Sequence, residues 1–232
     1  MNVAELIRDP PRLHLDETGG VTSWRLADDV LDFLDQNVTS ESRTLETGEG
    51  VSTILFALKG ASHVCVSPNE YSVQRIKEFC AANGISTDRL QFTMTPSDIA
   101  LPTLNGLELD LVLIDGGHGF PIPFLDWHYT AQLLKVGGYM IVDDTQLWTG
   151  QVLKDFLITE PEWEVHLDLH PRSVILRKKL NGGPGKEWVG QPYVVSRSYL
   201  PEPSPVRKAW KLVRKGEYRS LAGKMSRRLL SR

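Results

Sequence analysis

The sequence has little cysteine and no long hydrophobic run. Its two cysteines, Cys65 and Cys80, lie in apolar stretches without a second cysteine or a histidine at metal-ligand spacing, which excludes a disulfide framework and predicts buried free thiols. No run approaches the ~18 apolar residues of a membrane span, and the first twenty residues lack the apolar core of a secretory signal. We therefore expect a cytoplasmic protein.

Strong charge of one sign is also missing, because the net charge is only −3. The small total hides a division along the chain. Residues 205–232 carry ten Lys or Arg against one acid, a charge of +9, which leaves −12 for residues 1–204. An acidic body of this kind excludes nucleic-acid binding spread over the surface, and it leaves the tail as the candidate for an anionic partner.

The length and composition predict a globular chain with one main domain. The chain has 232 residues, 41% of them apolar and 24% charged, which is typical of one large domain or one domain with appendages. The composition predicts four parts: an N-terminal segment (1–22), a main domain (23–180), a Gly/Pro-rich loop and linker (181–204) and a basic amphipathic tail (205–232).

Apolar runs alternate with helical patterns through the main domain. This alternation predicts an α/β fold with a mostly parallel sheet of seven strands, helices on both faces and an antiparallel last hairpin. Ser23 is the expected N-cap of the first helix, and Gly84 the expected end of the third. We expect strands at 43–45, 63–66, 90–94, 109–114, 139–142, 163–169 and 173–177, and helices at 24–38, 52–59, 70–83, 124–134 and 151–158. In such sheets ligands bind outside the carboxyl ends of the strands.

The first strand ends in a glycine turn, in which Glu46 is followed by Gly48 and Gly50. Two glycines let the backbone approach a ligand closely, and an acid at the strand tip accepts hydrogen bonds. A tight turn without a ligand is the alternative. The position after the first strand of an alternating series favours a nucleoside cofactor.

The second strand ends without the acid that ordinarily holds a ribose. Ser67 stands in that place, and a serine lacks the two acceptor oxygens of a carboxylate. Asn69 and Glu70 are candidates to reach in from the following turn.

Three carboxylates follow the fourth and fifth strands. Asp115 ends one strand, and Asp143 and Asp144 end the next. Like charges at neighbouring strand ends repel unless a cation joins them, and oxygen ligands suit Mg²⁺ or another hard divalent cation. The alternatives are that Asp143 caps the following helix or that one acid pairs with an arginine.

His118 lies three residues beyond Asp115. A histidine titrates near neutrality, which suits the removal of a proton from a hydroxyl. The alternative is a loop histidine bonded to a backbone carbonyl.

Four segments together resemble the class I S-adenosylmethionine-dependent methyltransferases, and most closely their metal-dependent O-methyltransferase branch, over residues 24–178. They are LETGEGVST, TPSDIALPTL, LVLIDGGHGFPIPFLDW and LKVGGYMIVDDT. Asp115 in the third segment and Asp143 in the fourth are 28 positions apart. The resemblance implies that Glu46, Gly48 and Gly50 face the methionine part of the cofactor. The full set of cofactor-binding residues that it implies is Glu46, Gly48, Gly50, Ser52, Ser67, Ser97, Asp98 and Asp115, with Ser97 and Asp98 near the adenine.

The resemblance also implies a reaction. Asp115, Asp143 and Asp144 hold the metal, and His118 takes the proton of the acceptor hydroxyl, which then attacks the sulfonium methyl group; Asp115 and His118 are thus the catalytic residues. The GGH and Asp-Asp arrangement is similar to that of sugar methyltransferases, and this resemblance implies a sugar, a glycan or a glycosylated metabolite as the acceptor. Segments 24–25, 120–123 and 146–148 mix aromatic and polar groups that suit a sugar ring, although ordinary packing is the alternative for Trp24 and Trp148. A phenol suits the same groups.

Two other functions compete with this one. A non-catalytic member of the fold that binds a nucleoside or a membrane is supported by Ser67. A nicotinamide-dependent enzyme is disfavoured, because the third glycine is missing and the acids have no role there. The tail pattern is typical of an interfacial helix on anionic lipid at the inner membrane face, or else of a solvated or oligomer-packing segment.

Overall fold

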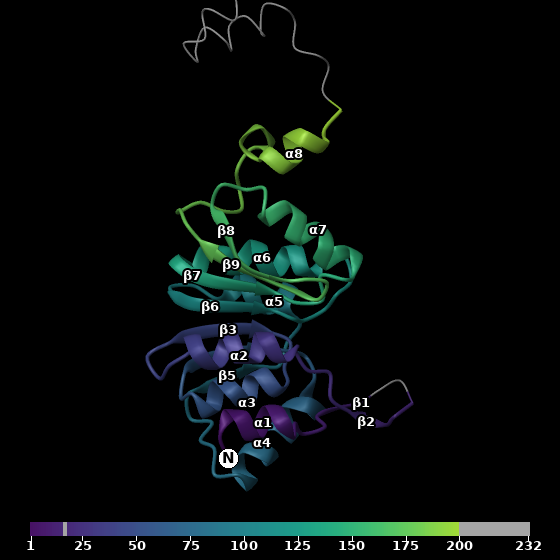
Figure 1. Ribbon diagram of the computed structural model, residues 1–232, viewed down its shortest axis with the longest axis vertical. Coiled ribbons are helices and arrows are strands. Elements are labelled where there is room, and N and C mark those ends of the chain that lie inside the picture. The colour runs from purple at the N-terminus through teal and green to yellow at the C-terminus, as the bar shows by residue number, and fades with distance from the viewer. Residues whose placement is uncertain (16–17, 200–232) are drawn as a thin grey trace, which may run out of the picture. The chain divides into compact units, whose positions relative to one another are not determined.

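The computed structural model describes residues 1–15 and 18–199. The chain divides into a compact unit of Met1–Val195 and a second unit that begins at Ser196. The first unit contains a seven-stranded sheet and, from the N-terminal segment, a small two-stranded one (Figure 1). The predicted basic tail, with its membrane or oligomer contacts, lies outside the described residues and stays a prediction.

The large sheet has the order β5-β4-β3-β6-β7-β9-β8. Its first five strands are parallel, and β9 runs antiparallel to both of its neighbours, β7 and β8, which gives the antiparallel last hairpin that the sequence predicted. Within this sheet the chain runs first through β3, then outward to β4 and β5, and then to β6 on the other side of β3. The switch point therefore lies between β3 and β6. The strands are β3 (Arg43–Thr47), β4 (Ser62–Val66), β5 (Leu90–Thr93), β6 (Leu109–Ile114), β7 (Leu134–Val142), β8 (Trp163–Leu169) and β9 (Ser173–Lys178).

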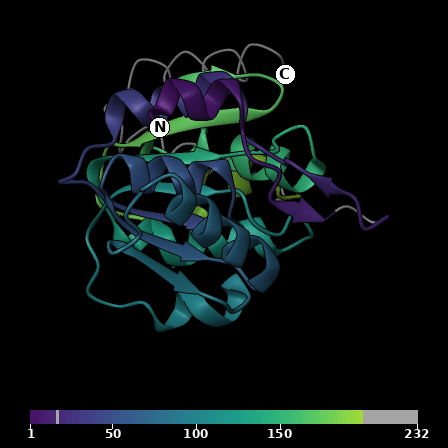
Figure 2. The same cartoon turned by 90° about the horizontal axis from the view of Figure 1, so that it is seen from below.

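Helices cover both faces of this sheet and form two separate cores (Figures 1 and 2). One core holds the helices that come before or among the first three strands, and the other holds those that follow β5. The first group is α1 (Val3–Arg8), α2 (Asp28–Asn37), α3 (Val51–Leu58) and α4 (Glu70–Ala82); the second is α5 (Ser97–Ala100), η1 (Leu101–Thr103), α6 (Ile122–Leu133) and α7 (Trp148–Leu157).

Strand β6 shows why an uninterrupted apolar run becomes a central strand. Leu111 and Leu113 pack into the first core, while Val112 and Ile114 pack into the second. Burying each such side chain stabilises the fold by about 1.5–3 kcal/mol. At the start of the strand, Asp110 pairs with Lys135 and accepts the Arg43 N–H. Although burial raises the pKa of Asp110, these two partners bring it below its ordinary value.

The N-terminal segment is more ordered than the sequence predicted. Helix α1 begins with a capping box between Asn2 and Glu5, and β1 (His14–Leu15) pairs with β2 (Val21–Thr22). The predicted start of the next helix at residue 24 is wrong, because α2 begins at Asp28 and its N-cap is Ala27 rather than Ser23. The Trp24 N–H instead donates to the His14 ring, which holds this stretch extended.

The C-terminal part of the first unit also differs from a simple linker. A short 3₁₀ helix, η2 (Trp188–Gly190), and α8 (Pro192–Arg197) occupy a stretch whose Gly and Pro content predicted a loop. Both cysteines are free and buried, as predicted, and burial raises the pKa of Cys80 to about 11. No helix in the described part of the chain is long and apolar enough to cross a membrane.

Helix α6 buries a carboxyl group, Asp126, without a partner. Asp126 is 0% exposed, and neither of its oxygens has a hydrogen-bond partner of ordinary geometry among the described residues. Burial is the main cause that raises its pKa to about 6, and the negative charge of Asp98 adds to the shift; the Ser97 and Thr47 hydroxyls oppose it only in part.

We predict that this group makes the fold less stable as the pH rises. The folded-state pKa of Asp126 lies above its ordinary value of 3.8, so the folded protein binds the extra proton between the two values. The free energy of unfolding, relative to an Asp126→Asn variant, should therefore fall by about 2–3 kcal/mol between pH 4 and pH 7. Urea denaturation of both proteins across this range measures the difference, and a pH-independent difference would contradict the prediction.

Candidate active site

A cavity of about 660 Å³ opens at the carboxyl ends of the central strands. This volume lies within the range of sites for small molecules and cofactors. Segments far apart in the sequence line it: His14, Ser23–Arg25, Thr47–Glu49, Val66–Asn69, Pro96–Asp98, Asp115–His118, Ile122, Asp143–Asp144 and Arg172. The site therefore lies at the switch point, where the sheet order predicts it.

The glycine turn touches the end of β6. Gly48 has a φ of +90°, and a Cβ at this position would lie 2.3 Å from the carbonyl oxygen of Asp115. Two backbone bonds fix the contact: the Gly48 N–H donates to Val66 (3.0 Å) and the Asp115 N–H donates to Thr47 (3.1 Å). Only glycine combines this backbone conformation with this approach.

Five of the residues predicted to bind the cofactor line this cavity, and three do not. Those in the cavity wall are Gly48, Ser67, Ser97, Asp98 and Asp115. The structure does not bring Glu46, Gly50 or Ser52 to the cavity; Gly50 faces His14 and the backbone of Trp24 instead.

Glu46 points into the protein, and this corrects the expectation that it faces a ligand. Its carboxylate accepts hydrogen bonds from Ser52 (2.7 Å) and Thr53 and lies 3.0 Å from Nε2 of His63. The other ring nitrogen of His63 lies 2.8 Å from the Thr44 hydroxyl. Glu46 therefore joins β3, α3 and β4 in a buried polar network and does not line the cavity.

An acid, a histidine and a second acid converge at one side of the cavity. Asp115, His118 and Asp144 each offer one ligand atom, and these atoms lie within 4.8 Å of one another. Nε2 of His118 is 3.1 Å from Oδ2 of Asp144. The prediction that the strand ends bring Asp115 and Asp144 close together is confirmed. The third member of the converging set is His118 rather than Asp143.

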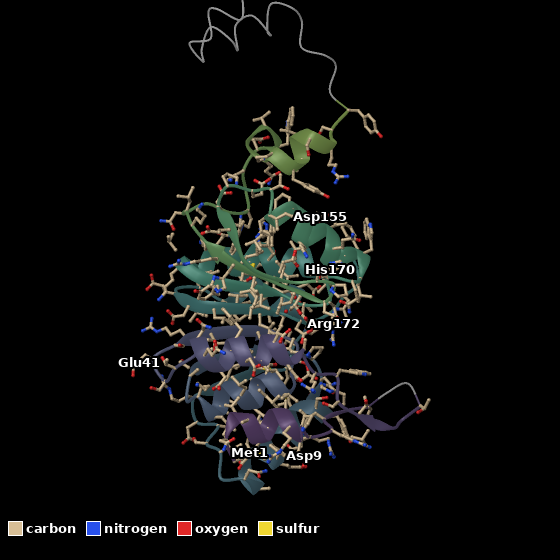
Figure 3. The ribbon with its side chains drawn as sticks, viewed as in Figure 1. Met1, Asp9, Glu41, Asp155, His170 and Arg172 are labelled. Atoms are coloured by element: carbon tan, nitrogen blue, oxygen red, sulfur yellow. The ribbon has the colours of Figure 1, made fainter. Side chains whose placement is uncertain are left out.

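Asp143 lines the same cavity but has other partners. Its Oδ1 accepts the Ser173 hydroxyl, and its Oδ2 is 3.9 Å from the Arg172 guanidinium, which is also 4.0 Å from Asp144. Figure 3 labels Arg172 and His170, which lie in the turn between β8 and β9. One arginine thus faces the acids, the pairing that the sequence left open.

The acids remain short of positive charge. Burial raises the pKa of Asp115 well above its ordinary value, and the charges of Asp143 and Asp144 raise it further, while Arg172 opposes the shift. Burial likewise raises the pKa of Asp143, and the Ser173 hydrogen bond opposes that shift. Two buried carboxyls with raised pKa values beside a cavity are typical of functional sites.

Asp144 has an unusual backbone conformation. Its φ is +52°, and it is the single residue other than glycine with a positive φ in the described chain. Aspartate tolerates this region better than most residues. Oδ1 accepts from the Gln146 amide at 2.5 Å, while Oδ2 stays directed at His118.

Sequence reasoning did not identify Glu49 and Arg172 as residues of the cavity. Glu49 lies between the two glycines, so its position in the turn was the available signal. Arg172 follows the proline of the last hairpin turn, and only the antiparallel return of β9 brings it to the acids. His14 enters from the β1–β2 hairpin, which periodicity does not reveal.

Comparisons with known proteins find a matching family and several solved structures with a similar fold. Residues 45–145 match a family described as "Methyltransferase domain". A search of curated proteins found no match.

Three solved structures share the fold at under 25% identity. A protein assigned as a caffeoyl-CoA O-methyltransferase from Staphylococcus aureus has a TM-score of 0.57 at 19% identity, over 66% of this chain and 85% of its own. Cofactor-bound Rv0187 from MTB has 0.58 at 17%, over 68% and 83%. A protein assigned as an O-methyltransferase from Klebsiella pneumoniae has 0.56 at 15%, over 76% and 95%.

The chain therefore contains a segment similar to methyltransferase domains, within a Rossmann-like α/β fold that it shares with these solved structures. The matched residues 45–145 contain the glycine turn, Ser67, Ser97 and all three acids.

We predict that Gly48→Ala disrupts the junction between the turn and β6. A positive φ costs a residue with a Cβ about 1–2 kcal/mol, and the clash with the Asp115 carbonyl adds to it, so we expect a loss of about 3 kcal/mol or more in the free energy of unfolding. Gly183→Ala is the matched control, because nothing lies within 4 Å of a Cβ there. Chemical denaturation compares the two, and equal midpoints would contradict the prediction.

Proposed function

We propose that the protein is an O-methyltransferase that uses S-adenosylmethionine and Mg²⁺ to methylate a hydroxyl of a sugar, a glycan or a glycosylated metabolite. The observation that carries the proposal is the convergence of Asp115, His118 and Asp144 at the side of the cofactor cavity. This arrangement sets oxygen ligands and a proton acceptor beside the place where a methyl group would be delivered.

The cavity suits a nucleoside cofactor. It extends from the glycine turn past Ser67 to Ser97 and Asp98, which gives polar groups over the length of an extended ligand. When bound, S-adenosylmethionine supplies a methyl group activated by its sulfonium.

The acids suit a hard divalent cation. Asp115 and Asp144 offer carboxylate oxygens, with Asp143 next to them, and Mg²⁺ prefers oxygen ligands. Arg172 is the single Lys or Arg within 4.0 Å of these acids in the described chain, so the cluster keeps a net negative charge. When bound, Mg²⁺ lowers the pKa of a hydroxyl group that it contacts.

The chain's own part in the reaction falls to His118 and the residues that hold it. Its imidazole is 44% exposed, so an acceptor can reach it. His118 would take the proton of the acceptor hydroxyl as that oxygen received the methyl group, and the bound S-adenosylmethionine would supply the methyl group and leave as the neutral thioether S-adenosylhomocysteine. Asp144 orients the ring through the 3.1 Å contact, and the Thr149 hydroxyl donates to the His118 carbonyl and fixes the loop.

Exposed aromatic side chains near the cavity support a ring-shaped acceptor. Trp24 is 60% exposed, Phe120 68% and Trp148 66%, and the rings of Phe120 and Trp148 are 6.3 Å apart. Aromatic faces beside charged groups suit a sugar ring as well as a phenol, so both belong in any panel of acceptors. Large apolar side chains left this exposed beside a cavity are typical of ligand-binding surfaces.

We predict that Asp144 is needed for the metal and His118 for the proton. Asp144→Asn should weaken Mn²⁺ binding, measured by electron paramagnetic resonance, on the order of 10-fold or more. His118→Gln should keep Mn²⁺ binding and lower turnover about 10²–10⁴-fold. Asp32→Asn, an exposed acid on α2, is the matched control for charge.

Turnover is measured as release of S-adenosylhomocysteine with a panel of sugars, glycosides and phenols. EDTA should abolish it while leaving cofactor binding intact in calorimetry. Full turnover in EDTA would exclude the metal. Failure of S-adenosylmethionine to bind would exclude the enzyme altogether, and binding without turnover on any acceptor would favour a non-catalytic member of the fold. If His118→Gln loses Mn²⁺ binding, the histidine is a ligand and not the base.

A further inference from the structure

The end of β4 offers no carboxylate for the ribose of the cofactor. Ser67 is buried and lines the cavity, and its hydroxyl already accepts the Asn69 N–H at 3.1 Å. Of the two residues that the sequence offered instead, Asn69 uses its side chain to accept the Ser72 N–H at the start of α4. Glu70 is exposed and does not line the cavity.

A carboxylate reaches this place from the neighbouring strand. β3 and β4 pair in parallel with Thr47 opposite Val66, so the turn after β3 and the turn after β4 lie side by side. Glu49 stands in the first turn, lines the cavity and has a side chain only 8% exposed. Its position brings an acid from the glycine turn to the point where the second strand lacks one.

The Glu49 carboxylate is surrounded by hydroxyl groups and one histidine rather than by a lysine or arginine. The hydroxyls of Ser67 and Ser72 both interact with the carboxylate. Its one ion-pair contact in the described chain is His14, with Nε2 3.9 Å from Oε1. A carboxylate that is largely buried and has no lysine or arginine partner is costly unless other donors bind it.

The β1–β2 hairpin holds the turn in position. The Trp24 N–H donates to Nδ1 of His14 at 3.4 Å, which leaves the ring proton on Nε2, and Nε2 donates to the Glu49 carbonyl at 3.0 Å. The Trp24 ring stacks on His14 with centroids 5.3 Å apart. The backbone of Glu49 is thereby fixed, so its side chain needs little further ordering to bind a ligand.

We infer that Glu49 binds the ribose of S-adenosylmethionine by accepting hydrogen bonds from both of its hydroxyls, in place of an acid at the end of β4. The inference rests on the proposed function, which supplies the ribose. A carboxylate has two oxygens that match a vicinal diol, and hydrogen bonds to a charged acceptor are the stronger kind. The site should therefore prefer a ribonucleoside over a deoxyribonucleoside.

Calorimetry with S-adenosylhomocysteine and its 2′,3′-dideoxy analogue tests this without an acceptor. Wild-type protein should bind the parent ligand at least 10-fold more tightly than the analogue. Glu49→Gln should weaken the parent ligand 10- to 100-fold and change the analogue less than 3-fold. Glu70→Gln, an exposed acid with the same change of charge, should bind both like wild type.

A rescue variant guards against a merely structural effect. Adding Ser67→Asp to Glu49→Gln restores a carboxylate at the end of β4 and should recover at least 10-fold of the lost affinity. Unchanged binding in Glu49→Gln, an equal loss for both ligands, or no discrimination by the wild type would overturn the inference while leaving the proposed function intact. Absence of any binding by folded wild-type protein would instead overturn the proposed function, and the inference with it.

Discussion

The site depends on the close contact between the glycine turn and the end of β6. Because Gly48 has no side chain, the backbone that follows β3 rests against the Asp115 carbonyl. This contact places the cofactor turn and the first acid side by side at the switch point of the sheet. The glycine turn and the acids that follow β6 and β7 can line one cavity only because these two backbones meet.

Charge is the second constraint on this site. Five carboxylates, from Glu49, Asp98, Asp115, Asp143 and Asp144, line one cavity together with two arginines, Arg25 and Arg172. All of these acids except Asp98 are at least partly buried, and such a concentration of like charge destabilises the fold unless a cation offsets it. The structure tolerates it through local partners, such as Ser173 for Asp143 and His118 for Asp144, and the remaining deficit favours ligands that carry positive charge. The two ligands proposed above, S-adenosylmethionine and Mg²⁺, both carry positive charge.

The architecture was predictable because its signals are local and repeated. Apolar runs such as 109–114 alternate with helical patterns, and the parallel order follows from that alternation. The meeting of Asp115 with Asp144 was predictable for the same reason, since both follow strands that become neighbours. The two-residue strands of the N-terminal hairpin carry no periodicity, so the contacts of His14 with Trp24 and Glu49 were not.

The direction of Glu46 was beyond a sequence argument for a physical reason. A strand covered on both faces has no alternation of apolar and polar residues. Its sequence therefore does not indicate toward which face of the sheet a polar side chain such as Glu46 points. The inward course depends on Ser52, Thr53 and His63, which come from two other elements. The same holds for Asp143, whose partner Ser173 arrives 30 residues later in the chain.

Strand β6 has an acid at each end, and the two are held in opposite ways. Asp110, at the start, is fully matched by Lys135 and Arg43, and its pKa is lowered. Asp115, just past the other end, is left among like charges, and its pKa is raised. The charge of Asp110 is thus neutralised within the fold, whereas the charge of Asp115 is left for a ligand to neutralise. The two edges of the sheet therefore differ in role. Substitution of Asp110 at the amino edge should mainly change stability, and substitution of Asp115 at the carboxyl edge should mainly change ligand binding.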